Sequence, residues 1–133
     1  MDELRASITR HEGVREKPYK CTAGKTSIGI GRNLDDTGVN ADEIELMLTN
    51  DINRSQSHAE TYRWFTDLAD ARQRVVIEMI FQMGLAGFAR FRRMIAAIER
   101  GDFASAANEM LDSKWAKQCP ERAKEMSLDM AEG

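Results

Sequence analysis

The spacing of hydrophobic positions changes along the chain and separates three regions. In residues 1–10, Leu4 and Ile8 stand four apart behind two acidic residues, which predicts a short helix with acidic side chains in its first turn. Between residues 13 and 38 glycines become frequent, and the segment 26–31, Thr-Ser-Ile-Gly-Ile-Gly, is too rich in glycine and β-branched residues for a helix. This second region predicts a small sheet built on a hairpin.

From residue 40 onward, hydrophobic positions recur at helical spacing almost to the end. Asn40 and Glu43 resemble a capping box, and they open a helix that we expect to run to about His58. Later stripes end at Gly84 and Gly101, and Pro120 stands in the first turn of a last short helix. The four apolar stripes are Ile44, Met47, Leu48 and Ile52; Val75, Val76, Met79, Ile80 and Met83; Phe91, Met94, Ile95 and Ile98; and Phe103, Ala107, Met110 and Leu111.

This order of elements predicts an α+β fold with lobes of unequal size. We expect a single domain over residues 1–133, with a small lobe at about 1–60 that carries the hairpin sheet and a helical lobe at about 61–133. The long helix that begins near Asn40 is expected to join the two lobes.

Composition narrows the class of protein. The chain of 133 residues is 42% hydrophobic and 31% charged, which is typical of a globular domain and excludes a disordered or collagen-like chain. No apolar run reaches the roughly 20 residues that span a bilayer, and the charged N-terminus predicts no export signal. Two cysteines, Cys21 and Cys119, are too few for a secreted disulfide framework, and whether they meet is left open. We expect a monomer without a cofactor, made in a cytoplasm.

Several weak motifs do not lead to a function. The pair Gly29 and Gly31 lacks the third glycine of a dinucleotide fingerprint. The residues His11, Cys21, His58 and Cys119 show no zinc-binding spacing, so no metal is expected. A basic run, formed by Arg90, Arg92, Arg93 and Arg100, is usually a solvated face, although it also suits an anionic polymer.

Glu12 is the more informative residue. It stands at the end of the first helix, before a glycine turn, where a carboxylate opposes the helix dipole. Such a placement needs either a basic partner or a functional reason, and the residues that follow Glu12 favour function.

Three separated stretches together resemble one family. His-Glu-Gly-Val-Arg at 11–15, Pro-Tyr-Lys-Cys-Thr-Ala-Gly at 18–24 and the segment 26–31 are similar to the active-site region of phage-type lysozymes, the endolysin muramidases of glycoside hydrolase family twenty-four. The family pattern is a Glu, eight residues, an Asp or Cys, five residues and a Thr, which falls on Glu12, Cys21 and Ser27. Further likeness is found at residues 81–84, 87–88, 113–115 and 120–124.

The resemblance implies a lysozyme-like fold and a role for each matching residue. Glu12 is the expected general acid, which must keep its proton near neutral pH and so requires partial burial. Arg122 is the expected partner that orients Glu12, and Phe81 and Gln82 are expected to bind the glycan. Cys21 replaces the usual Asp, and only roughly 3% of an ordinary thiol is ionised at pH 7. Cys21 is therefore expected to act as a base, as a nucleophile or as a group that orients the attacking water. Ser27 is expected to hold that water.

The resulting hypothesis is an endolysin that cleaves the glycan strands of bacterial peptidoglycan. It would wait in the host cytoplasm for a holin to open the membrane and then act on the periplasmic cell wall. The alternative is a catalytically silent peptidoglycan-binding module that lost its base at position 21. A nucleic-acid binder that uses Arg90, Arg92 and Arg93 is disfavoured by the net charge of −3.

Overall fold

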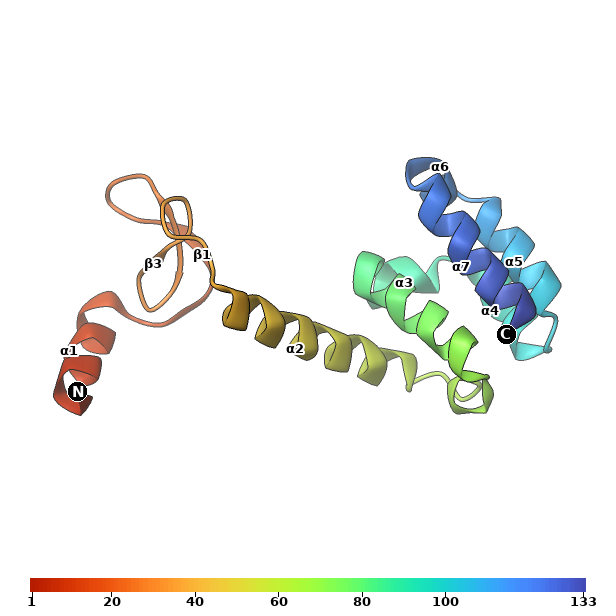
Figure 1. Ribbon diagram of the computed structural model, residues 1–133, viewed down its shortest axis with the longest axis horizontal. Coiled ribbons are helices and arrows are strands. Elements are labelled where there is room, and N and C mark those ends of the chain that lie inside the picture. Colours follow the sequence, from red (N-terminus) through yellow and green to blue (C-terminus); the bar gives the residue numbers. More distant parts are fainter. The chain divides into compact units, whose positions relative to one another are not determined.

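The computed structural model describes residues 1–133, which form two compact units, Met1–Met47 and Leu48–Gly133. The division falls within the long helix α2 (Ala41–Ala59), whereas the sequence placed the change of lobe near residue 60. The order of elements is that of an α+β fold, with seven α-helices and one three-stranded sheet (Figure 1). The predicted fold class is confirmed.

The first unit begins with helix α1 (Asp2–Glu12), which ends at Gly13. Gly13 has a φ of 76°, which a residue with a side chain rarely adopts, and its N–H closes the helix on the carbonyl oxygen of Thr9. The sheet follows as β1 (Arg15–Lys20), β2 (Thr26–Gly29) and β3 (Arg32–Asn33), paired antiparallel in chain order. The predicted helix and hairpin sheet are therefore both present.

The register of β1 and β2 is irregular. Arg15 pairs with Gly29 and Tyr19 pairs with Ser27, so a step of four residues along β1 matches a step of two residues along β2. Pro18 lies in this irregular stretch, where its missing N–H removes no regular ladder bond. After the bulge, Tyr19 and Lys20 pair regularly with Ser27 and Thr26, and the turn at Cys21 follows.

Helix α2 starts as the sequence predicted. The carboxylate of Glu43 accepts a hydrogen bond from the backbone N–H of Asn40 at 2.8 Å, which is one half of a capping box. The guanidinium of Arg32 on β3 binds the same carboxylate in a bidentate pair, at 2.7 and 2.8 Å, and also donates to the carbonyl oxygen of Gly38 at 3.1 Å. These bonds tie the first turn of α2 to the sheet.

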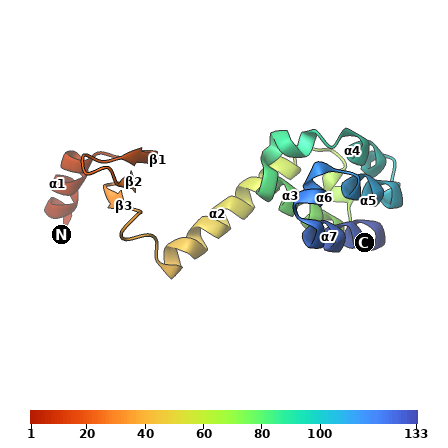
Figure 2. The same cartoon turned by 90° about the horizontal axis from the view of Figure 1, so that it is seen from above.

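The second unit is helical (Figure 2). A short 3₁₀ turn, η1 (Phe65–Asp67), precedes α3 (Asp70–Ala89), whose helical backbone is interrupted at Gly84 with φ 76° and ψ 167°. Gly84 therefore ends the regular helix, as the sequence predicted. The remaining helices are α4 (Arg92–Glu99), α5 (Phe103–Leu111), α6 (Lys114–Gln118) and α7 (Pro120–Glu132).

All buried hydrophobic residues lie between positions 59 and 130, so the apolar core belongs to the second unit. The predicted stripes of α3, α4 and α5 supply eight of these eighteen residues, whereas the stripe predicted on α2 remains 40–52% exposed. The buried positions of α2 are instead Ser55 and Ala59, near its C-terminal end. The fully or almost fully buried residues of the core include Val76, Met79, Ile80, Phe88, Met94, Ala97, Ala106, Met110, Ala123 and Met130.

Arg72 of α3 fastens the end of the chain to this core. Its guanidinium lies 3.6 Å from the centroid of the Phe103 ring and donates to the carbonyl oxygens of Met130 at 2.7 Å and Ala131 at 3.0 Å. The last carbonyls of a helix have no partner within the helix, so Arg72 satisfies two groups at the end of α7.

Candidate active site

The end of α1 brings Glu12 against the turn between β2 and β3. A Cβ atom at position 31 would lie only 2.6 Å from Oε2 of Glu12 and 2.8 Å from its Cδ. Because Gly31 has no side chain, the Glu12 carboxyl can occupy the space beside it. The φ of 75° at Gly31 is a second reason for a glycine at this position. The Glu12 side chain itself is exposed.

Cys21 begins the turn that joins β1 to β2. Its N–H donates to the carbonyl oxygen of Lys25 at 2.8 Å, and its own carbonyl oxygen accepts from the N–H of Gly24 at 2.9 Å. The N–H of Lys25 and, next, that of Ala23 lower the pKa of the Cys21 thiol; partial burial opposes them, and the Ser27 hydroxyl adds to the lowering.

Ser27 on β2 is the only buried residue of the first unit, at 3% exposure. The Ser27 hydroxyl is among the groups that lower the pKa of the Cys21 thiol, so Ser27 lies near a second residue that the family pattern selected. The turn favours the thiolate by hydrogen bonds and not by a neighbouring cation, which the sequence alone did not indicate.

In the second unit, Phe81 and Arg122 line one cavity of about 450 Å³ together with Leu48, Ile52, Arg74, Ile77 and Glu78. Phe81 is 42% exposed, so its ring is accessible. Nε of Arg122 donates to Oε2 of Glu78 at 2.8 Å. The predicted pairing of Arg122 with Glu12 stays a prediction.

Gln82 belongs to a different network. Its Oε1 accepts a hydrogen bond from the indole N–H of Trp115 at 2.8 Å, and its Nε2 donates to the sulfur of Cys119 at 3.7 Å. Neither Trp115 nor Cys119 was expected to contact Gln82, because the contact joins α3 to residues more than thirty positions away.

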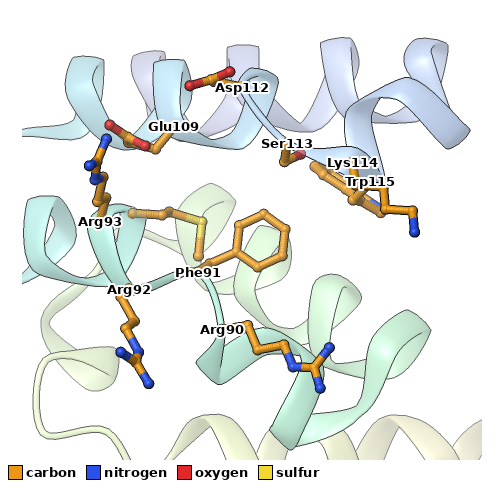
Figure 3. Close-up of a pocket in the computed structure, with 10 residues that line it drawn as sticks. Arg90, Phe91, Arg92, Arg93, Glu109, Asp112, Ser113, Lys114 and Trp115 are labelled. Carbon is orange, nitrogen blue, oxygen red and sulfur yellow. The ribbon is translucent and has the colours of Figure 1, made fainter.

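A further cavity of about 410 Å³ lies between α4, α5 and α6 (Figure 3). Phe91 and Trp115 meet edge to face there, with ring centroids 6.1 Å apart. Arg90, Arg92 and Arg93 share its wall with Glu109 and Asp112, so the basic run does not form a uniformly positive face. This mixture of charges disfavours the nucleic-acid hypothesis, since phosphate backbones require a continuous basic surface. The full lining is Arg90, Phe91, Arg92, Arg93, Met94, Glu109, Asp112, Ser113, Lys114 and Trp115.

Comparison with known proteins decides the family. Residues 9–127 match the family model described as phage lysozyme, which covers most of the chain and all of the predicted site residues. The chain belongs to the phage lysozyme family. The resemblance inferred from the motifs around Glu12 is thereby confirmed, and a lysozyme-like function is supported.

Individual relatives are distant. A probable T4-type lysozyme 2 of Dictyostelium discoideum is 24% identical, over 92% of this chain and 90% of the relative. An endolysin of Acyrthosiphon pisum secondary endosymbiont phage 1 is 26% identical, over 83% and 75% of the two chains. The pre-baseplate central spike protein Gp5 of Enterobacteria phage T4 is 28% identical over 95% of this chain, which matches only 27% of that protein.

None of the helices combines the length and the apolar composition that a membrane span requires. No group of three or more His, Cys, Asp or Glu side chains is arranged to hold a metal ion.

Proposed function

We propose that this phage lysozyme family member hydrolyses the β-1,4 bond between N-acetylmuramic acid and N-acetylglucosamine in bacterial peptidoglycan. The observation that carries the proposal is the hairpin of the first unit. It holds Glu12 against Gly31 and surrounds the Cys21 thiol with the backbone N–H groups and the Ser27 hydroxyl that favour its ionised form.

In this reaction Glu12 is the general acid that protonates the oxygen of the leaving sugar. The Glu12 side chain is exposed in the free protein, and we propose that the bound glycan shields its carboxyl group from water. Arg122 is proposed to orient the carboxyl group of Glu12 in that state.

Cys21 is proposed to act on the face of the sugar opposite to Glu12. As a thiolate it either takes a proton from the water that attacks the anomeric carbon or attacks that carbon itself, which forms a thioglycoside that water later cleaves. Ser27, which lies near the Cys21 thiol, is proposed to hold the attacking water. The lowered pKa of the thiol supports both thiolate roles over a neutral, water-orienting Cys21.

The glycan is proposed to contact the second unit at Phe81 and Gln82. The accessible Phe81 ring offers a flat apolar surface on which a sugar ring packs, and Gln82 offers a hydrogen-bonding amide. These contacts require a polymer with both apolar sugar faces and polar substituents, which describes peptidoglycan glycan strands.

The biological setting is the remaining part of the proposal. One relative is named an endolysin, and we propose the same role here: storage in the host cytoplasm, release by a holin, cleavage of the periplasmic wall and lysis of the host. Applied from outside to permeabilised bacteria, such a protein is expected to act as an antimicrobial.

The experiment compares the wild type with Glu12→Gln on chloroform-treated Gram-negative cells, measuring turbidity and new reducing ends. An amide cannot protonate the leaving oxygen, so we expect activity to fall by about 10²–10⁴-fold while the helical circular dichroism is unchanged. Glu16→Gln, which removes a nearby exposed carboxylate on β1, is the matched control and should keep full activity.

The outcomes separate the proposal from its alternative. Undiminished clearing by Glu12→Gln contradicts the assignment of the general acid. If the wild type binds purified sacculi but releases no reducing ends, the protein is the silent peptidoglycan-binding module.

A further inference from the structure

Three hydrogen bonds form a closed ring between Gln82, Trp115 and Cys119. The indole N–H of Trp115 donates to Gln82 Oε1 at 2.8 Å, and Gln82 Nε2 donates to Cys119 Sγ at 3.7 Å. The Cys119 thiol then donates to the backbone carbonyl oxygen of Trp115 at 3.2 Å. The ring joins α3 to both ends of α6.

The direction of every bond in the ring is determined by chemistry. An indole nitrogen only donates, so the oxygen of the Gln82 amide must face Trp115 and its nitrogen must face Cys119. A carbonyl oxygen only accepts, so the thiol hydrogen points to Trp115 and a sulfur lone pair faces Gln82. The amide of Gln82 therefore cannot turn over without breaking two bonds.

The ring leaves one hydrogen of Gln82 Nε2 without a partner, on an exposed side chain. Trp115, by contrast, is only 8% exposed, and Cys119 is partly buried, so the two partners of the amide are anchored in the core. A donor held in this way is pre-organised to meet an acceptor on a ligand, which reduces the entropy lost on binding.

We propose that Trp115 and Cys119 are positioning residues that hold the Gln82 amide as a hydrogen-bond donor to the glycan. This inference rests on the proposed function and adds a specificity to it. The group facing Gln82 is an acceptor oxygen, either the carbonyl of an N-acetyl group or a ring substituent.

Kinetics on soluble, uncross-linked glycan strands test the role of Cys119. Cys119→Ala removes the sulfur that fixes the amide, and we expect KM to rise about two- to tenfold with kcat within about twofold of the wild type. Cys119→Ser keeps both an acceptor and a donor and should restore KM. Gln118→Ala, the preceding exposed residue, is the matched control and should leave both constants unchanged.

A second readout reports the ring without depending on activity. The indole N–H of Trp115 gives its own nitrogen–proton NMR signal, and Gln82→Ala should shift it and accelerate its exchange with water because the acceptor is gone. Gln82→Glu keeps an acceptor for the indole but lacks the free N–H, so it should preserve the Trp115 signal and still raise KM.

The proposal is overturned if Cys119→Ala leaves KM unchanged, if Cys119→Ser is no better than Cys119→Ala, or if Gln82→Glu binds glycan as well as the wild type. If the wild type releases no reducing ends, the proposed hydrolase function fails separately. The same variants are then compared by their affinity for purified sacculi, and equal affinities contradict the positioning role.

Discussion

At the scale of single residues, the side chain that is absent from position 31 is as important as those present. Gly31→Ala would place a methyl group within 2.6 Å of the Glu12 carboxyl and strain a backbone with φ 75°. Because displacing a catalytic group by about 1 Å costs on the order of 10²-fold in rate, we expect Gly31→Ala to lose activity on that scale.

Gly38→Ala controls for the backbone strain alone. Gly38 has a φ of 65° and no atom within 4 Å of an added Cβ, so this variant shares the conformational cost without touching Glu12. Equal turnover by Gly31→Ala and Gly38→Ala, measured as reducing ends released, would contradict the role given to Gly31.

Cys21 gives a second prediction at this scale. If the thiolate is the base or the nucleophile, Cys21→Ser should be nearly inactive between about pH 5 and pH 9, because a serine hydroxyl does not ionise there. Cys21→Asp, which restores an anion, should be active if the anion serves as a base. The wild-type rate should rise with pH at values below the ordinary thiol range of about 8.5, since the pKa of Cys21 is lowered.

Full activity of Cys21→Ser across that range would show that the residue only orients water. Thr22→Ser, an exposed change at the next position of the same turn, is the control for disturbance of the turn.

At the scale of elements, the junction of β3 with α2 makes stability depend on acid pH. The hydrogen bonds from Arg32 and then the Asn40 N–H lower the pKa of Glu43 to about 2, against a smaller opposing effect of burial. In the unfolded chain a Glu carboxyl titrates near 4.3, so between about pH 5 and pH 2 the unfolded state binds the additional proton. The stabilisation is complete above that window and is lost as the pH falls through it.

Chemical denaturation at several pH values measures this contribution. Glu43→Gln should be less stable than the wild type near neutral pH, and the difference between the two should shrink as the pH falls toward 2. Glu45→Gln, an exposed change on the same helix without an ion pair, controls for the loss of one negative charge. A constant difference between wild type and Glu43→Gln at all pH values would contradict the assignment.

The elements also show what a sequence can and cannot predict. Helices with clear caps and stripes, such as those ended by Gly84 and Gly101, were predicted because local spacing and glycine conformation determine them. Helix α6 was not predicted as an element, because five residues are too few to show a period and its start depends on the Ser113 cap.

Some residues of the candidate site could be selected from the sequence, and others could not. Glu12, Cys21 and Ser27 were selected because their spacing along the chain resembles a family pattern, and their roles stay predictions. The partners of Gln82 were missed because the ring depends on the packing of α3 against α6, which no short-range pattern encodes. Gly31 was noted as part of a glycine-rich segment and of an incomplete dinucleotide fingerprint, and its closeness to Glu12 was missed, although a glycine in a strand often marks a close approach.

At the scale of the whole molecule, the proposed partnership of Arg122 with Glu12 is the central prediction. The pair that Arg122 makes with Glu78 has side chains 37% and 49% exposed, and exposed pairs contribute under about 1 kcal/mol. Arg122→Ala should therefore change the free energy of unfolding little, while it lowers the rate of glycan cleavage.

Glu78→Gln is the matched variant, because it removes the same ion pair but leaves the guanidinium in place. Turbidity assays and denaturant unfolding on both variants separate the two roles. If Glu78→Gln lowers activity as much as Arg122→Ala, the ion pair within the second unit explains the effect and the orienting role is wrong.

The composition of the core has a consequence for how well this chain tolerates substitution. Methionine side chains are unbranched and flexible, so a core rich in them adjusts to changes in the shape of its neighbours at small cost. Five of the eight methionines are buried here, which makes the second unit tolerant of the gradual exchange of one apolar residue for another. The scaffold that carries Gln82 and Arg122 is therefore expected to persist through such exchanges in this chain. The buried methionines are Met79, Met94, Met110, Met126 and Met130.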